Sequence, residues 1–228
     1  MADLLNEQIE YYRARANEYD DWFFRRGRFD RGEEATRRWF DEVRLVERAL
    51  DDFAPTGRVL ELACGTGLWT QRLARHTTEL TAVDTSPEVL EIARERLDGH
   101  PVDLVQADIF SFEPGERYDV VFFSFWLSHV PPERFGDFWA LVQRALAPQG
   151  RVFFIDSLAE ETSTAQDHVL TDRDAERMRR RLEDGREFWV YKVFYQPHEL
   201  MDHLGARGWN IDVNESGIYF LYGSGSRG

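Results

Sequence analysis

The apolar positions along the 228-residue chain follow two alternating patterns. Short, nearly continuous apolar runs are typical of strands covered on both faces, and they occur at 58–63, 79–84, 102–108, 118–125 and 151–156. Apolar residues at helical spacing predict helices at 33–52, 67–76, 86–97 and 132–148. Because these strands alternate with helices, the sequence predicts an α/β fold with a doubly wound, mainly parallel sheet.

The pattern changes after Asp156. The remaining segments predict a polar loop at 157–168, a charged, exposed helix at 172–185, an aromatic-rich strand at 187–195, a short helix at 197–208 and a hairpin at 209–225. No repeat or linker interrupts the sequence, so we expect a single domain over 1–228. We expect it to comprise a helical cap (1–52), a core (53–156) and an insertion with a terminal hairpin (157–228).

Charge and composition narrow the functional classes. The net charge of −14 disfavours nucleic-acid phosphates as partners and favours a cationic or neutral small molecule. Cys64 is the single cysteine, so no intrachain disulfide is possible, and no His/Asp/Glu cluster indicates a metal. The charged N-terminal segment has no signal-peptide pattern, and no apolar run approaches the ~20 residues that span a bilayer. A cytoplasmic protein without membrane contact is expected.

Three predicted strands end in residues suited to a nucleoside. Gly65 and Gly67 stand where the first strand passes into a helix, where a bare backbone and free N–H groups can receive a ligand. Asp84 ends the second strand and can accept ribose hydroxyls. Asp108 ends the third and can accept from an adenine amine, with the N–H of Ile109 free for a ring nitrogen. Ligands of open α/β sheets bind at such strand ends.

These segments resemble the class I S-adenosylmethionine (SAM)-dependent methyltransferases. The resemblance covers residues 54–156, and its motifs are ELACGTG, VDTSPEVLEIARE, ADIFSF, YDVVFFSFWLSHVPP and LAPQGRVFFID. It implies a Rossmann-like seven-stranded sheet ending in an antiparallel hairpin, SAM as cofactor and S-adenosylhomocysteine (SAH) as product. It places Glu61 near the methionine amino end, and Ala63 stands where glycine is commoner. The expected cofactor-binding residues are Tyr11, Tyr12, Glu61, Ala63, Gly65, Thr66, Gly67, Asp84, Thr85, Asp108, Ile109, Ser124 and Phe125.

The residues that bind the methyl acceptor are expected after the fourth strand and in the N-terminal cap. His129 is the candidate general base, because an imidazole titrates near neutral pH, although it could instead shape the loop. Tyr11 or Tyr12 could bind the methionine carboxylate, or both could pack on the core. Aromatic side chains favour a flat or hydrophobic acceptor, and the expected acceptor-binding residues are Tyr19, Trp22, Trp126, His129 and Tyr191.

The leading hypothesis is methyl transfer to an O, N or C atom of a small metabolite, of the kind found in secondary metabolism, by a monomer or homodimer. The alternatives are a protein or nucleic-acid methyltransferase and a non-catalytic SAM-binding protein. The nucleic-acid alternative lacks support, since the fourth strand is followed by SFWLSHVPP and not by N/D-P-P-Y/F. A nicotinamide oxidoreductase is disfavoured by the missing third glycine of G-x-G-x-x-G.

Overall fold

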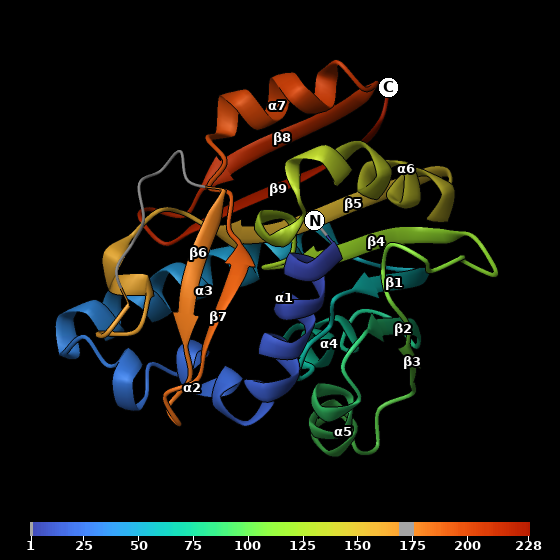
Figure 1. Ribbon diagram of the computed structural model, residues 1–228. Helices are drawn as coiled ribbons and strands as arrows, with labels where there is room; N and C mark the ends of the chain where they lie inside the picture. The colour runs from blue at the N-terminus through green and yellow to red at the C-terminus, as the bar shows by residue number, and fades with distance from the viewer. Residues whose placement is uncertain (1, 169–175) are drawn as a thin grey trace.

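The computed structural model describes residues 2–168 and 176–228. Seven strands form one sheet in the order β3-β2-β1-β4-β5-β9-β8 (Figure 1). The strands are β1 (Arg58–Leu62), β2 (Glu79–Asp84), β3 (Val102–Gln106), β4 (Tyr118–Ser124), β5 (Leu146–Ser157), β8 (Trp209–Glu215) and β9 (Phe220–Arg227). β1 to β5 pair in parallel, whereas β9 runs antiparallel to both β5 and β8. The predicted mainly parallel sheet with an antiparallel terminal hairpin is confirmed.

Helices cover both faces of this sheet because the strands bury alternate residues on opposite sides. Along β4, Val121 and Phe123 belong to the core under α6 and α7, whereas Val120 and Phe122 belong to the core under α3 and α4. The helices are α1 (Ala2–Ala14), α2 (Tyr19–Phe23), α3 (Glu33–Phe53), α4 (Leu68–Leu73), α5 (Pro87–Arg96), α6 (Phe135–Ala145) and α7 (Pro197–Gly205). Within the described residues, none of them has the length and apolarity needed to cross a membrane.

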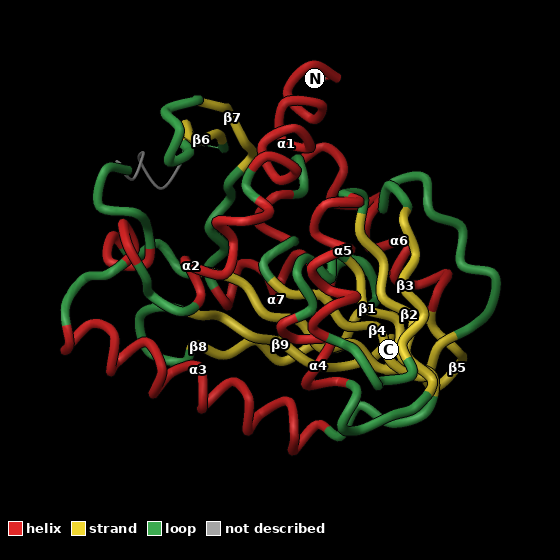
Figure 2. Tube along the Cα trace, turned by 90° about the horizontal axis from the view of Figure 1, so that it is seen from below, coloured by secondary structure: helices red, strands yellow, loops and turns green. Residues whose placement is uncertain are grey.

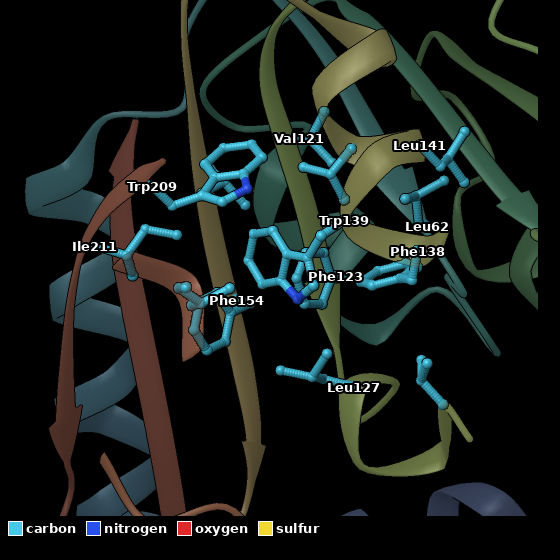
Figure 3. Packing of buried hydrophobic residues seen from close by; sticks show 14 of the residues in the cluster. Leu62, Val121, Phe123, Leu127, Phe138, Trp139, Leu141, Phe154, Trp209 and Ile211 are labelled. Carbon is cyan, nitrogen blue, oxygen red and sulfur yellow. The ribbon is translucent and has the colours of Figure 1, made fainter. Parts of the chain in front are cut away.

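Aromatic side chains fill the core between the sheet and α6 (Figure 3). Phe123 and Phe154 stack with ring centroids 5.4 Å apart. Trp139 meets both rings edge-on, at 5.8 and 5.9 Å. Offset and edge-to-face contacts of this kind are favoured by the ring quadrupole. This packing fixes β4 and β5 side by side and so positions the loops that follow them.

One predicted element is wrong. Residues 172–175 of the expected helix at 172–185 lie outside the described residues, and the rest forms β6 (Arg177–Arg181) and a turn. β6 pairs antiparallel with β7 (Glu187–Tyr191) in a separate two-stranded sheet. The residues of β6 alternate between exposed arginines and the buried Met178, which is a strand period that the high charge concealed. The turn between the strands contains Gly185 at φ +89°.

The expected helix at 132–148 is also shorter than predicted. A 3₁₀ turn occupies Pro132–Arg134, α6 ends at Ala145, and β5 begins at Leu146.

Near the N-terminus, α1 packs along β7 (Figure 1). Seen from below, α1 and the β6–β7 hairpin lie together on one side and α3 lies on the other (Figure 2). The segment before α3 and the β6–β7 hairpin together are called the cap below.

Candidate active site

A pocket of about 300 Å³ lies between the strand ends and the cap. Its volume is at the lower end of the range typical of small-molecule sites, about 300–1,000 Å³. The predicted site residues that line it are Tyr11, Tyr12, Tyr19, Trp22, Ala63, Gly65, Asp84, Thr85, Asp108, Ile109, Ser124, Phe125, Trp126 and His129. Four other predicted residues, Glu61, Thr66, Gly67 and Tyr191, are not part of its lining. The fold thus brings together residues that are far apart in sequence.

The two glycines of the turn after β1 have different surroundings. Gly65 has φ +54°, and a Cβ there would lie 3.9 Å from the ring of Tyr19 in the cap. Gly67 has φ +82°, and a Cβ there would lie 3.2 Å from that of Ala93 in α5. Gly65 therefore keeps the pocket open beneath a cap ring, whereas Gly67 allows the close packing of the turn on α5.

Two further pocket residues hold a left-handed backbone that glycine would adopt more easily. Ala63, after β1, has φ +56°, and Phe125, after β4, has φ +52°. Such conformations cost about 1–2 kcal/mol in an L-residue and are concentrated at functional sites. Ala63 therefore holds a backbone conformation that glycine adopts more easily.

Asp84 anchors the glycine turn to β2. One carboxylate oxygen accepts from the N–H of Gly65 at 2.9 Å, and the other accepts from the N–H of Ser86 at 3.0 Å. Burial raises the pKa of Asp84, and these backbone donors oppose the rise. Since a carboxylate offers about four acceptor positions, Asp84 retains capacity for two hydroxyls. Asp108 is exposed and accepts from the N–H of Phe110 at 2.9 Å.

Glu61 is fully buried beside the turn, and neither carboxyl oxygen has a hydrogen-bond partner among the described residues. Burial, together with the nearby Asp84, raises the pKa of Glu61 to about 8. The Thr70 hydroxyl lies close enough to lower this pKa in part. The two side chains do not form a hydrogen bond in this arrangement. An unpartnered buried carboxyl is costly and is suited to a cationic ligand.

His129 is a buried, neutral imidazole. Nδ1 lies 2.6 Å from the carbonyl oxygen of Tyr191, which can only accept, so Nδ1 carries the proton. Nε2 lies 2.8 Å from the hydroxyl of Tyr12 and therefore accepts from it. Burial, followed by the charge of Lys192, lowers the pKa of His129 well below 6.5. His129 thus joins the loop after β4 to both parts of the cap.

Thr66 ties the glycine turn to the N-terminal segment. Its hydroxyl donates to Asp20 at 2.7 Å, and Arg96 of α5 donates to the Thr66 hydroxyl at 2.9 Å and pairs with Asp20. Asp20 and Arg96 were not predicted as site residues, because they lie in different elements and belong to no motif. Together, Asp20 and Arg96 hold the cap against the glycine turn.

The cap end of the pocket is lined by cationic side chains, among them Arg15, Arg180 and Lys192. Burial lowers the pKa of Lys192 to about 8, although Asp156 stabilises its charge at 3.6 Å. The cap end of the pocket is therefore positively charged, although the net charge of the whole chain is −14. None of these three residues was predicted from the sequence, where the strand period of β6 is a signal for Arg180. Among the described residues, no group of three or more His, Cys, Asp or Glu side chains is arranged for a metal.

Comparisons with known proteins agree with this geometry. A family described as "Methyltransferase domain" matches residues 59–150. The solved structure of a DhpI–SAH complex is 36% identical, covers 100% of this chain and 98% of that chain, and has a TM-score of 0.80. A DhpI–SAM–HEP complex is 38% identical, covers 97% and 96%, and has the same TM-score of 0.80.

Curated relatives lead to the same class. A ubiquinone biosynthesis O-methyltransferase of Xanthomonas euvesicatoria pv. vesicatoria is 31% identical over 170 residues, 71% of this chain and 66% of that protein. A carboxy-S-adenosyl-L-methionine synthase of Aeromonas hydrophila subsp. hydrophila is 40% identical over 127 residues, which span about half of each protein, 51% and 49%. The fold and these comparisons define an α/β enzyme that uses SAM. The chain belongs to the class I SAM-dependent methyltransferases, as the resemblance implied.

Proposed function

We propose that this methyltransferase acts on a small molecule held between the cofactor turn and the cap. The observation that carries the proposal is the enclosure of the pocket, where Tyr19 of the cap lies over Gly65 of the turn. Tyr12, Trp22 and Phe29 complete that wall. A chamber closed by the protein's own N-terminal segment supports a small acceptor over a polymer strand.

Residues of the first three strands and their ends suit SAM. Glu61, buried behind the lining with its unpartnered carboxyl, would stabilise the cationic amino end through its charge. Asp84 would accept the ribose hydroxyls, and Asp108 with Ile109 would bind adenine. SAM supplies an electrophilic methyl group on a sulfonium. The chain's own contribution is to align the acceptor atom within about 3–3.5 Å of that methyl group and to exclude water.

His129 is the proposed base of this site. Its neutral Nε2 is an acceptor, and the Tyr12 hydroxyl that donates to it lines the same pocket. A proton leaving an acceptor hydroxyl could reach Nε2 through Tyr12, or directly after Tyr12 has turned away. Oxygen, nitrogen and carbon acceptors share this fold. Oxygen is the first to test, since several relatives are named O-methyltransferases.

The test is SAH production from SAM with a panel of small hydroxy-, amino- and carbon-acid compounds, beside folded RNA and a protein mixture. We expect SAH release that depends on one small-molecule class. Methylation of RNA or protein, with none of the small molecules accepted, would contradict the proposal. SAM binding without turnover on any acceptor would favour the non-catalytic alternative.

A further inference from the structure

The cap end of the pocket carries positive charge that the described residues do not neutralise. Arg180 forms no ion pair within that part of the chain, and its one side-chain hydrogen bond goes to Nδ1 of His168 at 3.1 Å. Since the guanidinium can only donate, Nδ1 of His168 accepts and carries no proton. Nε2 of His168 lies 3.1 Å from Nη2 of Arg28 and 3.1 Å from both the N–H and the carbonyl oxygen of Arg181. The partner of Arg180 is therefore a neutral ring.

His168 remains neutral for a physical reason. Burial, followed by the charge of Arg180, lowers the pKa of His168 to about 4. Burial also lowers the pKa of Arg180 itself. An arginine withdrawn from water without a counter-ion is unfavourable unless a ligand supplies the anion.

Three other cationic residues line the pocket, Arg134, Lys192 and Arg15. Arg134 pairs with Asp137 at 3.7 Å. Lys192 is already balanced, because it lies 3.6 Å from Asp156 and donates to Ser128 at 2.8 Å. Arg15 has no ion pair among the described residues, and its guanidinium lies over the Tyr19 ring at 5.2 Å. Since Tyr19 covers the glycine turn, Arg15 lies on the side of the pocket where the cofactor is expected. The carboxylates that line the pocket, Asp84 and Asp108, lie at the strand ends.

The direction of Arg180 is set by the period of β6. Met178 and Arg180 alternate with the exposed residues Arg177, Arg179 and Arg181, so Arg180 shares the inward face with the buried Met178. The Arg180 side chain is half-buried against the pocket, so it is only partly solvated. Its planar fork of donors matches the oxygens of a carboxylate or phosphate-type group.

We propose that Arg180 forms an oxyanion subsite, so that the methyl acceptor carries a carboxylate or phosphate-type group at its end away from the reacting atom. This rests on the proposed small-molecule function and names its substrate class. Arg180 would bind the anionic group, and Arg15 would strengthen the field from the cofactor side. The acceptor atom would then be directed toward the glycine turn.

The experiment is calorimetric titration of the SAH-loaded protein with inorganic phosphate and, separately, acetate. We expect saturable binding of at least one anion, and the tighter one identifies the type of group. Arg180→Gln should weaken that binding about 10- to 100-fold, the loss expected for hydrogen bonds to a charged partner. Arg180→Lys, which keeps the charge without the fork, should recover part of it.

Two measurements make the result decisive. Arg179→Gln is the matched control, because Arg179 is the exposed neighbour on β6 and pairs with Glu187 at 3.2 Å; it should bind the anion like wild type. SAH affinity should change less than about threefold in Arg180→Gln. No anion binding to the wild-type SAH complex, or equal binding by Arg180→Gln, would overturn the subsite. A large loss of SAH affinity in Arg180→Gln would overturn it too, since Arg180 would then serve the cofactor carboxylate. Failure of wild type to bind SAH is a separate outcome, which contradicts the proposed function.

Discussion

The hydroxyl of Tyr12 lies 2.8 Å from Nε2 of His129, joining the first helix of the cap to the loop after β4. Because Nδ1 of His129 is held by the Tyr191 carbonyl at 2.6 Å, Nε2 is the nitrogen available to accept a proton. The two residues are 117 positions apart in the sequence, so this pair depends on the packing of the cap against the loop after β4.

His129→Ala should lower kcat by at least ~100-fold if the imidazole is the base. SAH affinity should change far less, because no cofactor contact is removed. Steady-state kinetics and calorimetry on the same preparation measure both, and Tyr12→Phe should reproduce much of the loss in kcat. Unchanged turnover in His129→Ala would leave His129 as a structural link only.

The pH profile provides a separate check on the base. The active form would be the neutral imidazole, and burial places the pKa of His129 well below 6.5. Protonation therefore begins only when pH falls through that lowered pKa, so kcat should remain level as pH is reduced through 6.5. A fall in kcat centred at 6.5 would show that the titrating group is not this buried ring.

Cofactor binding should release a proton from Glu61. At pH 7 the free carboxyl, with its pKa of about 8, is mostly protonated, and a cationic amino group nearby would lower that pKa. Calorimetry in buffers of different ionisation enthalpy should detect nearly one proton released per SAM bound. Glu61→Gln should release none from this group.

The same residue affects the stability of the free protein. Its folded pKa lies above the ordinary 4.5, so its stabilising contribution is lost as pH rises from 4.5 through 8. Denaturant unfolding should show this slope in wild type and a shallower one in Glu61→Gln. Equal slopes would mean that Glu61 is not buried as a neutral group.

Asp84→Asn should weaken SAM binding by about 1–3 kcal/mol, or roughly 5- to 150-fold, because an amide accepts hydroxyl hydrogen bonds less strongly than a carboxylate. Asparagine also keeps one acceptor for the N–H of Gly65. Asp103→Asn, at an exposed position of β3, is the control and should bind like wild type. Unchanged affinity in Asp84→Asn would place the ribose elsewhere.

Asp20→Asn should loosen the cap. Asp20 accepts from the Thr66 hydroxyl at 2.7 Å and pairs with Arg96, so its charge holds the N-terminal segment on the glycine turn. We expect faster amide hydrogen exchange in α1 and α2 and a several-fold weaker SAH affinity. Asp21→Asn is the neighbouring control, because its pairing with Arg26 is looser, at 3.7 Å, and its partner is exposed. Identical exchange in the two variants would show that Asp20 does not hold the cap.

The sequence by itself determined the sheet and its cofactor edge. Strand and helix periods are local, so β1 to β5 could be predicted, and parallel pairing then places residues such as Gly65, Asp84 and Asp108 at one edge. Turn chemistry is local as well: Ser86 accepts from the N–H of Val89 as the N-cap of α5. What could be predicted is what a few neighbouring residues decide.

Only the tertiary structure decided how the pocket is closed and what charge it presents. The strand period of β6 was concealed by its arginines, and its inward face acquires meaning only where α1 packs on the hairpin. The link of Tyr12 to His129 and that of Asp20 to Thr66 join residues 117 and 46 positions apart. No local pattern encodes such contacts, because they depend on which buried surfaces pack together when the whole chain folds.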